Sequence, residues 1–380
     1  MTRLRALLAL APCLLYPAAI QAAPMTDTAD GMLDMGQYMS DSPYGFLPVP
    51  VVITEPAVGY GGGLFGLFLH DTGQQNETPR PGRPMTPAAI SALGGGATQN
   101  GTWFVGGGHR HTWNNDAIRY LVALGYADIN LDIYTGDVPG FGGGKGVSTQ
   151  TKGYGETQKL LFRLADTPFF IGGSQVYANT KISADNPVIS RALQQVLGES
   201  STSSGLGLVM EYDTTDNLFY PRNGLSASAE YQFYTSFIGG DYRYDLLTLD
   251  GKYFHPLGQS LTLAIAGNYQ SLSNHESHLT PMARPFIKLR GIPSYRYQGD
   301  YVGVGQTQLE WQVTPRWVVQ GFVGAGSASH DAQDLFNKTE VAWGGGFRYL
   351  IAQKFGLYTG IDVAFSDSDQ ALYFNVGSGL

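Results

Sequence analysis

Three charged residues in the second half of the chain have the types and positions needed for ion-pair chemistry. Arg290 lies in the expected loop 272–301, which is long enough to be functional. Glu310 and Asp362 each fall on the polar side of a segment in which apolar and polar residues alternate. A planar guanidinium fits a carboxylate, and a charge enclosed in a narrow interior needs a partner. An ion pair between Arg290 and these acids is one interpretation, and an exposed loop arginine is the other.

Other residues with chemical potential do not combine into a cofactor site. The stretch 61–66 fits G-x-G-x-x-G, but a strand-like segment follows it and not the helix that a dinucleotide site requires. The glycine-rich stretch 140–146 lacks the leading Gly and the Ser or Thr of a phosphate-binding loop. His109 and His111 share one strand face, with no third metal ligand in sight. No G-x-S-x-G elbow occurs. We therefore predict no catalytic residue, no metal and no cofactor.

The segments that carry these residues alternate strictly between apolar and polar or small side chains. In 225–233 and 357–365 one face is apolar and the other is mainly polar or small, which predicts strands. The segments run about 10 residues, longer than most strands of soluble sheets and long enough to cross a membrane. A soluble sandwich gives the same alternation. A closed transmembrane barrel fits better, because it leaves no strand edge unpaired in lipid.

The composition agrees with an exported membrane barrel. Of the 380 residues, 14 % are charged and 43 % are hydrophobic. This hydrophobic share excludes a disordered chain. Past the first 20 residues, no apolar run is long enough for a spanning helix. The net charge of −8 comes without a basic patch, so we do not expect nucleic acid as a partner.

The first residues have the features of a secretory signal peptide. Two arginines precede a mostly apolar run, and small residues follow up to a cleavage position after Ala22. The only cysteine, Cys13, lies in this segment, so the exported chain would have no disulfide. We predict a signal peptide over 1–22, an N-terminal lead-in over 23–55 and a transmembrane β-barrel over 56–380.

The predicted fold is all-β, with 16 antiparallel strands, an even number as in bacterial barrels. The predicted strands of the first half are 57–70, 88–98, 101–113, 116–125, 126–135, 156–165 and 168–184. Those of the second half are 203–213, 224–235, 241–254, 259–271, 303–313, 316–326, 340–352, 355–366 and 371–380. The predicted long connections are 71–87, 136–154, 185–202, 272–301 and 327–339.

Several stretches together resemble one family of barrels. The stretch 288–300, with Leu289-Arg290-Gly291-Ile292 near its start, resembles the loop motif of the BamA/TamA outer-membrane barrel superfamily, also called the bacterial surface antigen family. The stretch 213–224 resembles the family's turn between strands eight and nine. Glu310 falls where the family has a glutamate in strand twelve, and 371–380 falls where its C-terminal insertion signal belongs.

The chain also departs from the family's pattern. Ile292 replaces the usual aromatic residue of the loop motif, Gly324 stands where many members have an inward aspartate, and Leu380 replaces a final aromatic residue. The lead-in 23–55 is too short for one of the family's periplasmic POTRA domains. The resemblance therefore implies a barrel-only member of the family.

The resemblance also implies roles for particular residues. The long loop would fold into the lumen and place Arg290 against acids of the barrel wall. The first and last strands would form a weak seam. The implied lumen-loop residues and partners are Arg290, Gly291, Glu310 and Asp362. The implied periplasmic-turn residues are Asp213, Asp216, Phe219, Pro221 and Gly224. The implied insertion signal comprises Phe374, Val376, Gly377 and Leu380.

The function expected from this resemblance is the assembly of outer-membrane proteins or the translocation of polypeptides, with no enzymatic activity. The expected partners are outer-membrane lipid, the machinery that inserts the barrel itself and an unfolded polypeptide client. Two alternatives stay open at this point: a passive or gated pore, and a structural or surface-antigen barrel with no transport role.

Overall fold

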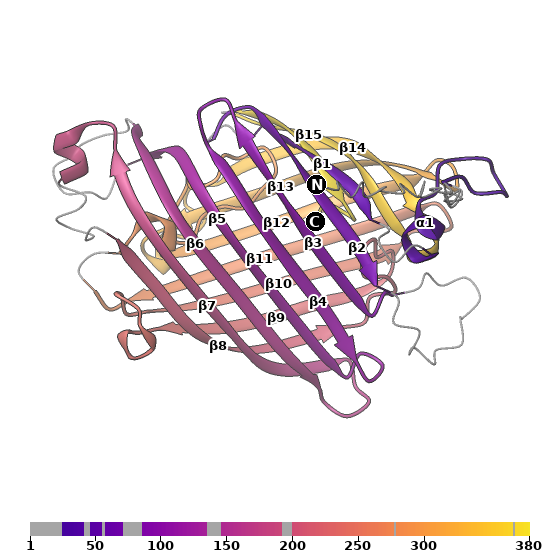
Figure 1. Ribbon diagram of the computed structural model, residues 1–380, viewed down its shortest axis with the longest axis horizontal. Coiled ribbons are helices and arrows are strands. Elements are labelled where there is room, and N and C mark those ends of the chain that lie inside the picture. Colours follow the sequence, from indigo (N-terminus) through magenta and orange to yellow (C-terminus); the bar gives the residue numbers. More distant parts are fainter. Residues whose placement is uncertain are drawn as a thin grey trace, which may run out of the picture.

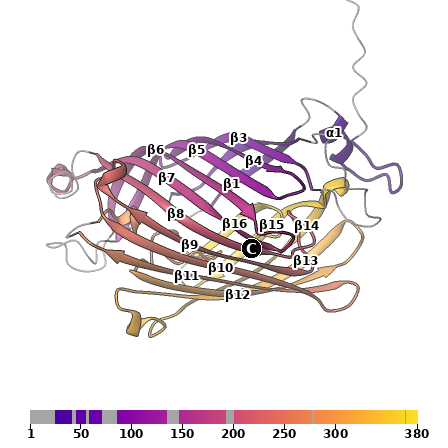
Figure 2. The ribbon, with the colours of Figure 1, turned by 90° about the horizontal axis from the view of Figure 1, so that it is seen from below.

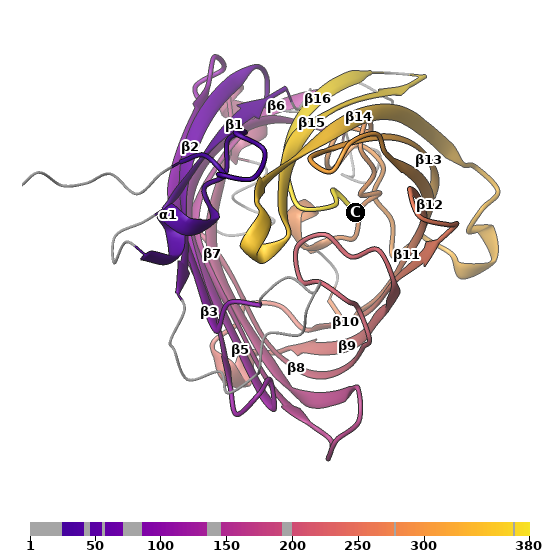
Figure 3. The ribbon, with the colours of Figure 1, turned by 90° about the vertical axis from the view of Figure 1, so that its right-hand side faces the viewer.

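The computed structural model describes residues 25–41, 46–54, 58–70, 86–134, 146–191, 200–276, 279–367 and 369–380. These residues form one 16-stranded antiparallel sheet in which each strand pairs with the next along the chain. The sheet curls into a nearly closed barrel (Figure 1, Figure 3). None of the helices in these residues is long and apolar enough to cross a membrane.

The elements follow one another along the chain without crossovers. The strands are β1 (Leu47–Ile53), β2 (Gly61–His70), β3 (Ala89–Thr98), β4 (Trp103–Trp113), β5 (Ile118–Tyr134), β6 (Gly146–Arg163), β7 (Phe169–Ala184), β8 (Ser201–Asp213), β9 (Gly224–Tyr234), β10 (Tyr244–Pro256), β11 (Leu261–Asn274), β12 (Tyr301–Gln312), β13 (Trp317–Ser329), β14 (Glu340–Ala352), β15 (Leu357–Ser366) and β16 (Gln370–Val376). The helices are α1 (Gly36–Asp41) and the short 3₁₀ helices η1 (Ser236–Ile238), η2 (Pro281–Ala283), η3 (Ala332–Asp334) and η4 (Gln353–Phe355).

The number of strands is as predicted, but only because two errors in the predicted first half compensate for each other: one strand was missed, and another was divided into two. The segment 47–53, expected to be lead-in, is β1 and pairs with β2, so the barrel begins before residue 56. The predicted strands 116–125 and 126–135 are one strand, β5, which runs through Gly125 without a break. The sequence hid β1 because Pro48 and Pro50 are breaker residues in strand patterns.

These two differences reverse the direction of β2, β3 and β4. Counting from β1, His70 and Ala89 lie at the end of the barrel that carries α1, not at the opposite end with the long loops. We call these two ends the α1 end and the far end; β7 finishes at the far end (Figure 1, Figure 2). Part of the connection predicted over 71–87 lies outside the described residues, as does the predicted signal peptide 1–22.

The two faces of the sheet have opposite chemistry, as predicted. Large apolar side chains point outward and are exposed, for example Leu93 at 64 %, Leu124 at 62 % and Leu208 at 69 %. Polar side chains are buried on the inner face, among them Gln308 and Arg348. A soluble protein has the reverse distribution, whereas a transmembrane barrel has this one. The chain is therefore a transmembrane β-barrel.

Exposed tryptophans mark both rims of the outer face. Trp113, Trp311 and Trp317 lie on the outer face at the α1 end, and Trp103 and Trp343 lie on it at the far end. Aromatic girdles at the two membrane interfaces are typical of such barrels. They bound the lipid-facing band of this sheet.

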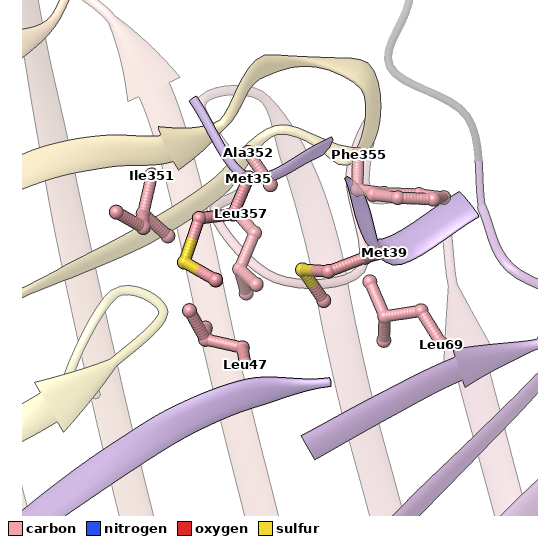
Figure 4. Packing of buried hydrophobic residues seen from close by; sticks show 8 residues of the cluster. All are labelled: Met35, Met39, Leu47, Leu69, Ile351, Ala352, Phe355 and Leu357. Carbon is pink, nitrogen blue, oxygen red and sulfur yellow. The ribbon is translucent and has the colours of Figure 1, made fainter. Parts of the chain in front are cut away.

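An apolar cluster at the α1 end joins the N-terminal segment (residues 25–41) to the wall. Met35 and Met39 pack among side chains from both sides of the gap between the first and last strands (Figure 4). The other members of the cluster are Leu47, Leu69, Ile351, Ala352, Phe355 and Leu357. A main-chain bond of 2.7 Å from Met35 N to Ile351 O adds to this contact.

The same N-terminal segment forms a charged contact with the turn before β13. The guanidinium of Arg316 lies 2.5 Å from Asp27, 2.6 Å from Asp30 and 2.6 Å from Asp34. These hydrogen-bonded acids raise the pKa of Arg316 above its ordinary value, although burial acts against them. The side chain of Arg316 is only 3 % exposed. The N-terminal segment 25–41 is therefore part of the barrel rim.

The last four residues leave the wall and enter the barrel. β16 ends at Val376, and Gly377 (φ +91°) and Gly379 (φ +81°) turn the chain inward (Figure 3). Leu380 O accepts a hydrogen bond from Lys252 Nζ on the inner face of β10. The predicted strand 371–380 is therefore wrong over its last four residues, because two glycines in left-handed conformation end the strand after Val376.

Candidate functional site

Asp362 is the centre of a buried polar network on the inner wall. Its side chain is fully buried on β15. It pairs with both terminal nitrogens of Arg348, at 2.7 and 2.8 Å, and with Arg290 Nη1 at 2.7 Å. Gln320 Nε2 at 3.0 Å and Asn375 Nδ2 at 2.8 Å also donate to it. One carboxylate therefore connects the long loop with β13, β14 and β16.

Arg348 holds the inward-turning end of the chain as well as Asp362. Its side chain is fully buried. Nε donates to Gly377 O at 3.0 Å, and Nη2 donates to Ser378 O at 3.2 Å. Two parallel bonds to a carboxylate fix the plane of a guanidinium. Arg348 is thus oriented by Asp362 to donate hydrogen bonds to the main-chain carbonyls of Gly377 and Ser378.

Arg290 comes from the long loop and reaches the wall. Its guanidinium carbon lies 3.5 Å from the centre of the Phe322 ring, and Nη2 donates to Gln308 Oε1 at 2.9 Å. Its side chain is 10 % exposed. The interpretation as an exposed loop arginine is therefore wrong, and the predicted pair with Asp362 is present.

The predicted direct contact between Arg290 and Glu310 is absent. Glu310, which is 2 % exposed, instead accepts a hydrogen bond of 2.7 Å from Gln308 Nε2. The oxygen of the same Gln308 amide accepts a hydrogen bond from Arg290. Gln308 therefore stands between the two charges. Side-chain alternation predicts that both charges face the lumen, but it does not predict that the Gln308 amide lies between them.

The loop is anchored by apolar packing near these charges. Ile287, Leu289 and Ile292 form a buried cluster with Val302 and Val304 of β12. Ile292 is 3 % exposed, so the aliphatic residue in the motif fills a core position between loop and wall. Burial of a large aliphatic side chain contributes about 1.5–3 kcal/mol, so this packing holds the loop even apart from the ion pair.

Two glycines of β13 make room for the loop. A Cβ at Gly324 would lie 2.5 Å from Leu289 Cδ2, and one at Gly326 would lie 2.6 Å from Ile287 Cγ2. An aspartate at position 324, common in the resembling family, would therefore collide with this loop as it is packed here. The departure at Gly324 has a local physical reason.

Gly291 takes a backbone conformation that favours glycine. Its φ is +93°, and an added Cβ would lie 3.2 Å from Ala364 and Phe365 atoms. Its N–H donates to Tyr373 Oη at 2.9 Å, and its carbonyl accepts from Ser366 Oγ at 2.7 Å. The loop is thus fixed to both β15 and β16 next to Arg290.

The turn between β8 and β9 lies at the α1 end and is built by short-range bonds. Asp216 Oδ1 accepts from the N–H groups of Arg222 and Asn223, at 2.9 and 3.2 Å. Gly224 has φ +114°, and an added Cβ would lie 2.4 Å from Thr214 O. Phe219 O accepts a bond of 3.2 Å from Ser378 N.

The remaining predicted turn residues lie in the same structure. Pro221 is buried, and Asp213 pairs with Arg119 of β5 at 3.0 Å. The predicted residues of this turn therefore gather at the α1 end of the lumen. The predicted loop residues gather on the wall formed by β12 to β16. Phe374 and Val376 of the predicted insertion signal lie on the outer face of β16.

A second charged group on the inner wall was not predicted. Arg119 binds Asp116 at 2.5 Å as well as Asp213, and Arg163 binds Asp116 at 2.7 Å. The ring of Phe170 lies 3.8 Å from the guanidinium carbon of Arg119. Side-chain alternation along an unbroken β5 would have placed Arg119 in the lumen.

Part of the inner wall formed by β2 to β7 is mainly apolar. A cavity of about 400 Å³ lies there, lined mainly by small and aromatic residues of β2 to β7. Its lining includes Phe65, Phe104, Gly106, Gly125 and Gly153, and Met282 closes it from the loop. The lumen therefore combines charged groups, on the loop-bearing wall and around Arg119, with a mainly apolar, glycine-rich patch.

One part of the chain matches a family of known domains. Residues 145–288 match the Omp85 superfamily domain. A comparison with curated proteins found no match.

Solved structures resemble the whole barrel at low sequence identity. BamA from Haemophilus ducreyi lacking POTRA domains 1–3 aligns with TM-score 0.55 and 11 % identity, over 87 % of this chain and 70 % of that chain. CdiB from Acinetobacter baumannii aligns with TM-score 0.55 and 12 % identity, over 87 % of this chain and 59 % of that one. CdiB from Escherichia coli aligns with TM-score 0.57 and 12 % identity, over 87 % and 61 %. At such identities these likenesses concern the fold, and this chain spans about three fifths of the CdiB chains.

Proposed function

Because this chain is a BamA/TamA-type barrel of the Omp85 superfamily, we propose that it assembles other outer-membrane proteins or moves polypeptides across that membrane. The observation that carries the proposal is the long loop, which is held against the inner wall by Arg290, Asp362 and Arg348. A loop fixed in this way occupies lumen space that an open diffusion pore would leave to water.

The proposed location is the bacterial outer membrane, with the α1 end in the periplasm. Bacterial barrels have short periplasmic turns and longer extracellular loops. The short turns around 257–260 and 313–316 lie at the α1 end, and the loop that carries Arg290 starts and ends at the far end. The signal peptide over 1–22 and the insertion signal with Phe374, Val376, Gly377 and Leu380 belong to this proposal.

The proposed mechanism has no covalent step. The buried polar groups of the lumen bond to one another: Asp362 with two arginines, and Gln308 with Arg290 and Glu310. The proposed work is done by the sheet edge and the loop, so the protein acts through binding and not through catalysis. The proposed partners are lipid, the insertion machinery and an unfolded polypeptide client.

Quantitative proteomics of outer membranes after depletion tests this function. Loss of a defined subset of other barrels or secreted proteins is the expected result. Normal levels of all of them would contradict the proposal and favour a structural or surface-antigen role. Ion conductance of the purified protein in planar bilayers tests the pore alternative. Large steady currents in the unmodified protein would favour a pore.

A further inference from the structure

The apolar cavity on the inner wall of β2 to β7 differs from the usual interior of a transmembrane barrel, which is polar. No charged residue is among the described residues that line its volume of about 400 Å³. The rings of Phe65 and Phe104 are stacked there, with their centres 6.3 Å apart. The volume lies within the range of small-molecule sites, and a lining of this kind favours an apolar occupant over water.

One row of paired residues gives the cavity its length. The row crosses the sheet from Phe65 on β2 to Ala178 on β7, and both of these residues line the cavity. Glycines occupy the positions between them, namely Gly94, Gly106, Gly125 and Gly155. The row spans about 24 Å, because neighbouring strands lie about 4.8 Å apart. Four strands therefore present only main chain along this row, and the resulting long strip fits an extended hydrocarbon chain better than a compact ring system.

A buried hydroxyl group in the lining points to a ligand that also carries polar atoms. Thr151 of β6 lines the cavity and is only 3 % exposed. In the part of the chain that the structure describes, its Oγ1 has no hydrogen-bond partner. Most buried polar side-chain atoms have one, and an unpaired hydroxyl in such a place is destabilising. Thr180, which also lines the cavity, contrasts with it, because its hydroxyl bonds to Ser201 Oγ at 3.1 Å.

A second cavity, of about 300 Å³, adjoins the first beneath the long loop. Three residues line both cavities: Ala178, Thr180 and Met282. Thr151 lies near this junction, because its partner on β7 is Ile182, two residues from Thr180. Among the described residues, the charged side chains that line the second cavity are Arg284 and Lys288. The apolar strip thus leads into a space whose charged groups are both cationic.

The two cations of the second cavity differ in their pairing. Arg284 lies 3.4 Å from Asp300, so its charge is balanced. The ammonium of Lys288 lies 5.3 Å from the centre of the Phe286 ring, and none of the carboxylates that the structure describes pairs with it. A cation in a confined space without a counter-charge attracts an anion.

We propose that the lumen binds a single-chain amphiphile with an anionic head group. Its hydrocarbon chain lies along the glycine row between Phe65 and Ala178, and its head group pairs with Lys288. A fatty-acid carboxylate and the phosphate of a lysophospholipid share this chemistry. Because Met282 and Lys288 belong to the long loop, the ligand connects the loop with the wall of β2 to β7. This site is separate from the proposed function and does not depend on it.

Protection of a cysteine from a thiol reagent tests the position of the chain. In a Cys13→Ala background the chain contains no other cysteine. Ala127→Cys places a thiol in the cavity, and Ser228→Cys places one on the inner face of β9, between Glu211 and Asp250. Each variant is reconstituted in phosphatidylcholine nanodiscs at mildly alkaline pH, where a carboxylate is ionised, and treated with a water-soluble maleimide. We expect hexadecanoate to slow labelling several-fold at position 127 and to leave labelling at position 228 unchanged.

Substitution of Lys288 tests the head group. In the Ala127→Cys protein, Lys288→Gln should raise the hexadecanoate concentration for half-protection several-fold and leave protection by uncharged hexadecan-1-ol unchanged. Lys159→Gln is the matched control, because Lys159 is a lumen lysine already paired with Glu211 and Glu230, at 3.6 and 3.3 Å. Hexadecyl phosphate replaces hexadecanoate in a parallel series. The anion that protects at the lower concentration identifies the head group as phosphate or carboxylate.

Two variants of the lining test the cavity itself. Ala178→Leu fills the place where the two cavities meet and should abolish protection at position 127. Thr151→Val keeps the shape of the side chain but removes the unpaired hydroxyl, and it should weaken protection by the amphiphile. The heat-modifiable band of a folded barrel confirms that each variant has folded. Thr151→Val provides the second readout where Ala178→Leu fails to give this band.

Several outcomes would overturn the inference. Neither anion might protect position 127, or both might protect position 228 equally. Lys288→Gln might behave like Lys159→Gln, or hexadecan-1-ol might protect as well as the anions do. Unchanged protection in both Ala178→Leu and Thr151→Val would also contradict the site. Labelling uses purified protein, so normal levels of other barrels after depletion would refute the proposed function and leave a positive result here intact.

Discussion

At the scale of single residues, the lumen is organised around balanced charges. Arg290 and Arg348 contribute two positive charges, and Asp362 and Glu310 contribute two negative charges, with Gln308 between the halves. Removal of one partner of a buried ion pair is more damaging than removal of the whole pair, because a charge is left unpaired. We therefore expect the substitution of each of these residues to have a different effect on stability or on the loop.

The first prediction concerns Asp362. Asp362→Asn should leave two buried guanidiniums without a carboxylate, and we expect a loss of about 3–5 kcal/mol in the free energy of unfolding. The temperature at which the folded band disappears on a gel measures the loss. Asp250→Asn is the matched control, since Asp250 is an exposed lumen acid. Equal loss in both variants would show that position 362 is not special.

The second prediction concerns Arg290. Arg290→Ala removes the contacts with Asp362, Gln308 and Phe322 but leaves the apolar anchor of the loop. We expect a folded barrel whose loop is cut faster by protease and whose conductance is higher. Arg243→Ala, which removes an arginine with 61 % exposure, is the control. Unchanged cleavage and current would refute a restraining role.

At the scale of elements, the N-terminal segment and β16 carry the most information. The segment 25–41 bonds to β14 and to the turn at Arg316, and it packs on β1 and β2. A segment with this arrangement restrains both sides of the seam between β1 and β16. Its release should therefore depend on conditions that protonate Asp30.

The third prediction is a pH dependence of this segment. The hydrogen bond from Arg316 holds the pKa of Asp30 below its ordinary value. The carboxylate is ionised in the docked state, so its contribution is present above about pH 4 and is lost as the pH falls further, through the lowered pKa. Proteolysis of the segment by pepsin should therefore accelerate steeply below about pH 4. In Arg316→Gln the segment should be cut readily throughout the acidic range in which pepsin is active, so the ratio of its cleavage rate to that of the unmodified protein should be largest near pH 4 and fall toward one at lower pH.

The fourth prediction separates the two halves of the expected insertion signal. Phe374→Asp places a carboxylate on the lipid face of β16, at a cost of up to about 2 kcal/mol depending on depth. We expect a lower yield of the protein in the membrane. Leu380→Asp changes a residue that lies in the lumen near Lys252 and should leave the yield close to normal. A reversed order of yields would contradict the described end of β16.

At the scale of the whole molecule, the fold is a continuous antiparallel meander from β1 to β16. The apolar cluster around Met35 and Met39 at the α1 end joins its first and last strands. The fifth prediction is a heat-modifiable band. The unboiled protein should migrate differently from the boiled one, because a barrel with a continuous 16-strand ladder resists detergent until it is heated. Identical mobility of both samples, or recovery of the protein in soluble fractions, would contradict a membrane barrel.

Much of this architecture was predictable from side-chain alternation. Every strand from β8 to β16 was located, because apolar and polar residues alternate strongly there. In the first half, glycines such as Gly106 and Gly125 weaken the alternation, and the prolines of β1 conceal a strand that pairs on one side only. The alternation of side chains along each strand predicted that Glu310 and Asp362 point into the lumen. The Gln308 link did not, because it depends on side-chain conformations that no periodicity encodes.

The seam between β1 and β16 has a kinetic consequence. Fifteen pairings link strands that follow each other directly, so each can form as a hairpin soon after its two strands meet. Thr54 and Leu372, by contrast, are 318 residues apart. The entropy lost in bringing distant residues together precedes the gain from their contact. We therefore expect ring closure to be the last event of folding and, because Thr54 links β1 to β16 at the far end through its side chain, the first contact to be lost on unfolding.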